Sequence, residues 1–98
     1  TDYAAARQRH VRLAILRHLE GSSEYTSNTS MLGDVLRGVG LPCTRDQVAG
    51  ECAWLAEQGF AAVDGDGEFA VVRATGRGVE LAQGAAAHPG VHRPRPRL

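Results

Sequence analysis

A short break containing glycine and proline separates two amphipathic segments in the middle of this 98-residue chain. Between Leu32 and Val39 the apolar residues recur at i, i+3, i+4 and i+7, which predicts a helix with one apolar face. Gly40 and Pro42 end that helix, because glycine suits its exit and proline cannot continue it. Thr44 then opens another helix. Two helices joined by so few residues are typical of a helix-turn-helix unit.

A further helix is predicted near the start of the chain. Over residues 3–19 apolar side chains recur every four residues with arginines between them, which predicts a helix packed on a broad face. Residues 20–28 are rich in Ser, Thr, Gly and Asn, so we predict a loop. Asn28 or Thr29 is then placed to cap the helix that follows.

A hairpin and a short helix follow the third helix, which ends at Gly59. Residues 60–63 and 69–74 predict two short strands, because the Asp-Gly pairs between them are a hairpin signal. Thr75 is placed to cap a short last helix. The predicted fold is therefore mainly α with a small β-hairpin. It is a winged helix-turn-helix with three helices, a two-stranded wing, a short C-terminal helix and an extended tail.

The chain is long enough for one small domain. We assign residues 1–87 to the winged-helix domain and residues 88–98 to a basic, flexible tail, since its alternating Pro and Arg favour an extended, solvated chain. The tail holds three of the eleven arginines and none of the eleven acids. Eight arginines thus remain against eleven acids, and the domain carries a formal charge of −3.

Four stretches of the sequence stand out together: Thr44–Val48, Ala53–Phe60, Ala74–Gly78 and Val91–Pro96. They resemble small winged-helix proteins of Mu-like phages and prophages, a group often labelled ArsR-like transcriptional regulators. The resemblance spans nearly the whole chain. It implies a winged-helix fold and a role in regulating phage or prophage transcription. We expect a homodimer that binds double-stranded DNA.

The first turn of the third helix is the candidate for reading DNA bases. Arg45 would pair with guanine, Gln47 with adenine, and Thr44 would contact phosphate. The alternative is that Thr44 and Gln47 form a capping box and do no more than that. The other candidate DNA contacts are arginines of the wing, the last helix and the tail: Arg73, Arg77, Arg93, Arg95 and Arg97.

The opposite hypothesis is a winged-helix module that binds a phage or host protein and no DNA. Acidic residues lie on the outer side of the third helix and in the hairpin, where phosphates would repel them. Trp54 and Gly50 lie on that outer side and are the candidate interface residues. For Trp54 the alternative is packing under the hairpin or against the first helix. For Gly50 the alternative is that the glycine has no functional role.

Several other functions are not expected from this sequence. It contains no phosphate-binding loop, zinc spacing or nucleophile elbow, so we predict neither an enzyme nor a cofactor. Cys43 and Cys52 would lie roughly 12 Å apart along a helix, too far for a disulfide. They also lack the clustering seen in metal-sensing ArsR proteins, so no metal is expected. Without an apolar span or signal peptide, we expect no membrane partner and a place in the bacterial cytoplasm.

Overall fold

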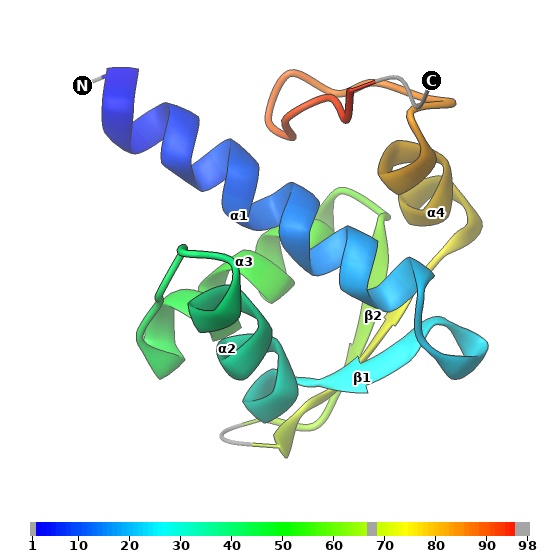
Figure 1. Ribbon diagram of the computed structural model, residues 1–98. Helices are drawn as coiled ribbons and strands as arrows, with labels where there is room; N and C mark the ends of the chain where they lie inside the picture. The colour runs from blue at the N-terminus through cyan, green and yellow to red at the C-terminus, as the bar shows by residue number, and fades with distance from the viewer. Residues whose placement is uncertain (1, 67–68, 96–98) are drawn as a thin grey trace.

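A computed structural model describes residues 2–66 and 69–95 of the chain. Within that part, four α-helices and a three-stranded antiparallel sheet form a compact α/β domain (Figure 1). The elements are α1 (Asp2–Glu20), η1 (Ser23–Tyr25, a 3-10 turn), β1 (Thr26–Asn28), α2 (Thr29–Gly38), α3 (Arg45–Glu57), β2 (Ala61–Asp64), β3 (Val71–Ala74) and α4 (Gly76–Gln83). Helix α1 is central and contacts the other helices and the sheet.

The predicted helix starts are confirmed by their caps. Asn28 caps α2, its Oδ1 accepting a hydrogen bond of 2.8 Å from the amide of Met31. Thr44 and Gln47 form the predicted capping box at α3. The amide of Gln47 donates to Thr44 Oγ1 at 3.1 Å, and the amide of Thr44 donates to Gln47 Oε1 at 2.9 Å. Thr75 caps α4. Local sequence therefore sets where these helices begin.

The sheet differs from the predicted two-stranded wing. Its strand order is β1-β3-β2, because Thr26–Asn28 pairs antiparallel with β3, with Ser27 opposite Val72. The prediction of a loop over residues 20–28 was wrong for this part. β1 is three polar residues long and shows no alternation of polar and apolar side chains. Its partner strand lies more than forty residues further along the chain, so no pattern in the neighbouring sequence predicts β1.

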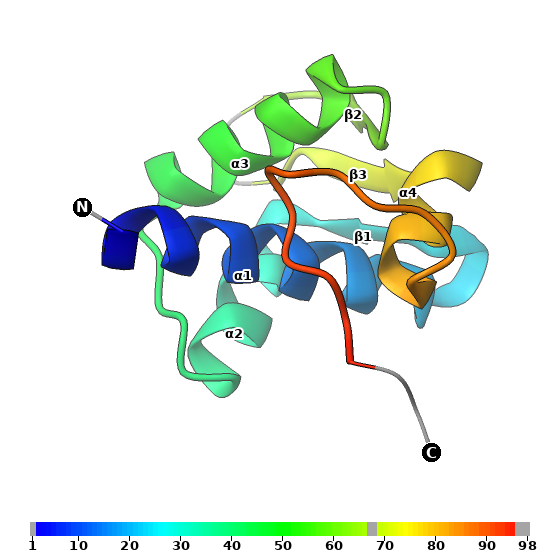
Figure 2. The same ribbon diagram turned by 90° about the horizontal axis from the view of Figure 1, so that it is seen from above.

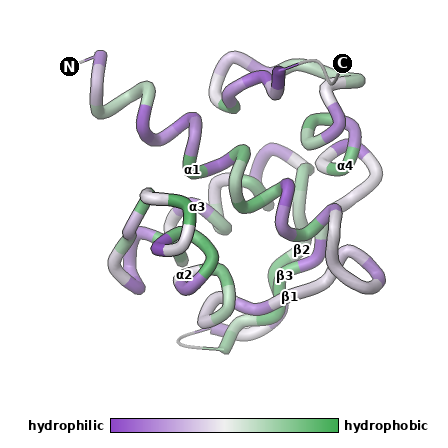
Figure 3. Tube along the Cα trace, in the orientation of Figure 1, coloured by the Kyte–Doolittle hydropathy of each residue, from purple (hydrophilic) through white to green (hydrophobic). Residues whose placement is uncertain are grey.

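The hydrophobic core lies between α1, the other helices and the inner face of the sheet. The buried residues of α1 lie between Val11 and Leu19, where Figure 3 shows the most hydrophobic positions of this helix. The largest fully buried side chains of the core are Ile15, Leu16, Leu19, Leu32, Leu36, Leu55, Val11, Val72 and Cys52. Among residues 2–66 and 69–95, no helix combines the length and apolar character needed to cross a membrane.

The C-terminal segment, residues 84–95, returns across α1 after α4 ends (Figure 2). Val91 is buried, and the amide of His92 donates to the carbonyl of Arg9 at 3.1 Å. Val91 is therefore not solvated as predicted, because its apolar side chain packs in the core. Arg93 and Arg95 are exposed as expected. Arg97 lies outside the described residues.

Candidate functional site

The first turn of α3 is exposed, as a DNA-reading surface requires. Thr44, Arg45 and Gln47 are all exposed. The capping box, however, uses the side-chain oxygen of Gln47 as an acceptor. A bidentate contact with adenine needs that same oxygen together with the amide nitrogen, so capping competes with base recognition. This geometry favours the capping alternative for Gln47 and leaves Arg45 as the side chain best suited to a base edge.

The arginines of β3 and α4 belong to other parts of the fold than this turn. Arg73 is exposed on β3, opposite Thr26 and Ala62. Arg77 lies with its guanidinium carbon 5.1 Å from the centroid of the Phe60 ring, and its Nη1 donates to the carbonyl of Gln58 at 3.4 Å. Arg77 is therefore held at the C-terminal end of α3, and the length of that helix, about 20 Å, separates it from the first turn.

The arginines of the C-terminal segment lie on another side of the molecule. In Figure 2, α1 runs between α3 and the end of the described chain. Arg93 and Arg95 line a pocket with residues of α1 and α4, and no residue of α3 contributes to that pocket. The residues predicted to bind DNA therefore do not form one continuous surface.

Trp54 packs within the chain. The guanidinium carbon of Arg12 lies 3.7 Å from the centroid of its indole ring, and its ring centroid is 5.4 Å from that of His88. Trp54 thus packs against α1, one of the two alternatives that we considered, and also against the C-terminal segment. Gly50 is exposed, and a Cβ built on it meets no atom within 4 Å. No neighbour in the described chain requires glycine at that position.

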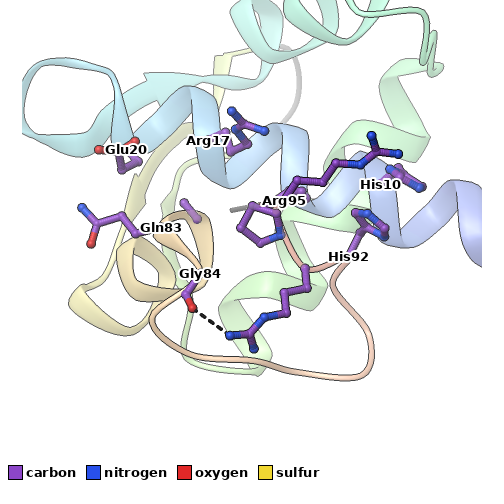
Figure 4. Close-up of a pocket in the computed structure, with 11 residues that line it drawn as sticks. His10, Arg17, Glu20, Gln83, Gly84, His92 and Arg95 are labelled. Carbon is purple, nitrogen blue, oxygen red and sulfur yellow. Dashed lines mark hydrogen bonds between the residues drawn. The ribbon is translucent and has the colours of Figure 1, made fainter. Parts of the chain in front are cut away.

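A pocket of about 820 Å³ lies between α1, α4 and the C-terminal segment (Figure 4). Its α1 wall comes from His10, Leu13, Arg17 and Glu20, at i, i+3, i+7 and i+10, which share one helix face. The other lining residues are Ala82, Gln83, Gly84, His92, Arg93, Pro94 and Arg95. We call this the cationic pocket, because five of its side chains are arginine or histidine and one, Glu20, is acidic.

Two imidazoles stack inside this pocket. The ring centroids of His10 and His92 are 3.8 Å apart, with 25° between the ring planes. The pKa of His92 is lowered from its ordinary 6.5, first by burial and then by the positive charges of His10, Arg9 and Arg95. Figure 4 shows Arg95 near this pair and Glu20 at the far end of the pocket. Burial and these positive neighbours thus favour the neutral form of the His92 imidazole.

His10, Arg17 and His92 were not among the predicted site residues. The helical spacing of His10 and Arg17 was a usable signal, because it places both on one face of α1. His92 carried no such signal, because its position depends on the return of the C-terminal segment over α1.

The two cysteines are free, as predicted, and they differ in environment. Cys52 is buried, and burial, followed by the nearby charge of Glu51, raises its pKa from 9.0 to about 12. Cys43 is half-buried beside Leu41. Among the described residues, no group of three His, Cys, Asp or Glu is placed to hold a metal ion.

We expect the thiol of Cys43 to react with an aromatic disulfide reagent at pH 8, and that of Cys52 to stay unreacted until the protein unfolds. The thiolate is the reactive form, and burial keeps Cys52 protonated at this pH. Absorbance should report one thiol per chain in buffer and two in guanidinium chloride. Two thiols reacting at equal rates in buffer would contradict the buried position of Cys52.

The chain is similar to a protein of phage Mu. No family model matches the chain, and no solved structure matches it at a significant level. The chain is 44% identical over 86 residues to the uncharacterized protein gp26 of Escherichia phage Mu, and the match covers 88% of both chains. This confirms the predicted link with Mu-like phages. On this similarity, the chain belongs to the family of phage Mu gp26.

Proposed function

We propose that this protein is a winged helix-turn-helix that binds double-stranded DNA and regulates phage or prophage transcription. The element order α1-β1-α2-α3-β2-β3, together with the β1-β3-β2 sheet, carries the proposal. In a winged helix-turn-helix the third helix enters the major groove and the hairpin lies alongside it. Here the first turn of α3 is exposed, and β2 packs against α3. A homodimer would present two such helices to neighbouring half-sites.

Two exposed arginines are proposed to contact DNA, one from the first turn of α3 and one from the wing. Arg45, the first residue of α3, would contact a guanine edge. Arg73 on β3 would contact the phosphate backbone from the wing. The other exposed charges of α3, Asp46 and Glu57, are both acidic. We therefore expect moderate affinity that depends strongly on salt concentration.

The test is fluorescence anisotropy of a labelled random-sequence duplex at low and at physiological salt. The native protein should bind at low salt and lose affinity steeply as salt rises. The Arg45→Ala/Arg73→Ala variant should bind about tenfold or more weakly, because each arginine contributes a charge-assisted contact. Arg37→Ala is the matched control, since Arg37 is an exposed arginine on α2 that pairs with Asp34. No binding at low salt, or equal binding by the double variant, would overturn the proposal.

One observation supports a second candidate function, binding of a phage or host protein. The hairpin exposes apolar side chains next to acidic ones. Val63, Phe69 and Val71 are 38%, 69% and 45% exposed. Asp64 pairs with Val71 across the two strands, and Asp66 is exposed further along the same turn. Such a surface suits a protein partner better than a phosphate backbone. If DNA binding is absent at low salt, this becomes the leading candidate.

A further inference from the structure

We propose that the cationic pocket between α1, α4 and the C-terminal segment is a second binding site, which takes the phosphate groups of a ligand. It lies on the side of α1 away from α3, so it is separate from the surface proposed above to read DNA (Figure 2). The pocket volume of about 820 Å³ is within the range of small-molecule sites. Its α1 wall runs from His10 to Glu20, about 15 Å, which is long enough for more than one phosphate.

The positive charges of the pocket are not neutralised within the described chain. Arg17, Arg93 and Arg95 are exposed, and none of them forms an ion pair with a described carboxylate. Arg93 donates one hydrogen bond, of 3.2 Å, to the carbonyl of Gly84. By contrast, Arg12 pairs with Glu51 and Arg37 pairs with Asp34. In a protein of zero formal net charge, these arginines concentrate positive charge in one concave place.

The wall formed by the C-terminal segment is held in position by contacts with α1 and with Trp54. Arg12 Nη1 donates to the carbonyl of Gly90 at 3.0 Å, and the ring of Trp54 packs against Gly90. Val91 is buried, and the amide of His92 is bonded to α1. Arg93 and Arg95 therefore extend from an anchored backbone. Because the backbone is already anchored, this segment loses less conformational entropy when a ligand binds.

The stacked histidines give the pocket a way to respond to an anion. The charged and titratable groups around His92 are Arg9, His10, Arg17 and Glu20 on α1, and Arg93 and Arg95 on its own segment, while α4 contributes the neutral Gln83. A bound phosphate would offset this positive field and favour the imidazolium form. Phosphate binding should therefore raise the pKa of His92 and tighten as pH falls towards 6.

Phosphate groups reach such a pocket from two sources: a nucleic-acid backbone, or a free phosphate compound such as a nucleotide. Amide NMR spectra of the full chain distinguish them. One titration uses inorganic pyrophosphate, and another uses a short duplex of random sequence. If the pocket binds phosphate, peaks of residues 9–20 and 83–95 should shift. Shifts with duplex alone identify a backbone as the ligand, whereas shifts with both probes identify phosphate groups in general.

The variant Arg17→Gln/Arg93→Gln tests the pocket directly. This variant should bind the probe that shifts the amide peaks of the pocket residues about tenfold or more weakly, because charge-assisted hydrogen bonds to phosphate are lost. Arg37→Gln is the matched control and should bind like the native protein. Both arginines of the double variant are exposed, so its thermal unfolding should match that of the native protein and a folding defect is readily seen.

The outcomes separate this inference from the proposed function. Shifts confined to α3 and the hairpin would overturn the second site while supporting DNA reading by α3. Pocket shifts that survive the Arg45→Ala/Arg73→Ala substitutions would support the second site on its own. No pocket shift with either probe, or no rise in the His92 pKa on adding a probe that binds, would overturn it.

Discussion

Gly78→Ala should destabilise the protein by about 3 kcal/mol or more, at the upper end of what overpacking costs. Gly78 is buried in α4, where that helix meets the start of β2. A Cβ at this position would lie 2.0 Å from the carbonyl oxygen of Phe60 and 3.2 Å from a methyl group of Leu16. The nearest obstacle is backbone, so a side chain cannot rotate away to make room. The helix would have to move off the core.

Thermal unfolding followed by circular dichroism measures this effect. For a domain of this size, a loss of 3 kcal/mol lowers Tm by roughly 10–20 °C. Gly50→Ala is the matched control, because Gly50 lies inside α3 and a Cβ there meets nothing within 4 Å. It should raise stability by about 0.5–1 kcal/mol, since alanine is the better helix former. A Gly78→Ala protein as stable as the native one would contradict the packing of α4 on Phe60.

Arg12→Ala should cost about 3 kcal/mol, the second largest effect that we expect. Arg12 Nε donates to Glu51 Oε1 at 2.7 Å, and the side chains of Arg12 and Glu51 are only 11% and 13% exposed. Truncating Arg12 leaves a largely buried carboxylate without its cation, which is more costly than deleting a surface pair. It also removes the stacking on Trp54 and the hydrogen bond to Gly90.

A double-mutant cycle with Glu51→Ala isolates the pair from the other contacts of Arg12. Because the two side chains interact directly, the double variant should be more stable than the sum of the single losses predicts. Arg37→Ala is the control, since Arg37 and Asp34 are 60% and 63% exposed, and it should change stability by less than about 1 kcal/mol. Additive losses for Arg12 and Glu51 would contradict a coupled ion pair.

The Arg12 variant also connects stability to the cationic pocket. Arg12 lies outside the pocket and holds Gly90, two residues before His92. We expect Arg12→Ala to loosen the C-terminal segment, so that a protease cleaves the chain near residues 88–95 faster than in the native protein. Arg12 is therefore a positioning residue for the pocket wall.

Much of the helical structure was predictable, because it depends on neighbours in the sequence. The capping box of Thr44 and Gln47 and the caps at Asn28 and Thr75 are signals within one helical turn. The buried stripe Val48, Cys52 and Leu55 follows from helical periodicity alone. The hairpin was also recognisable from its Asp-Gly pairs, although β2 and β3 begin one and two residues later than predicted.

Long-range pairing was not predictable in the same way. Thr26–Asn28 forms a strand because it pairs with the edge of β3 that β2 does not occupy. Arg93 and Arg95 were recognised as basic residues, but their neighbours were not. They join His10 and Arg17 because the chain turns back at Gly84 and Val91 enters the core. No single segment carries that information, since it depends on where α1 and α4 meet.

By itself, the sequence determined the helices, their caps, the hairpin and the phage relationship, because hydrogen bonds within a turn and apolar periodicity act over a few residues. The tertiary structure decided which charges share a surface. It separated Arg93 and Arg95 from Arg45 and gathered them with Arg17 and two histidines. Burial of Val91 and the Arg12 anchor set that arrangement, because packing brings together residues that are some eighty positions apart in the chain.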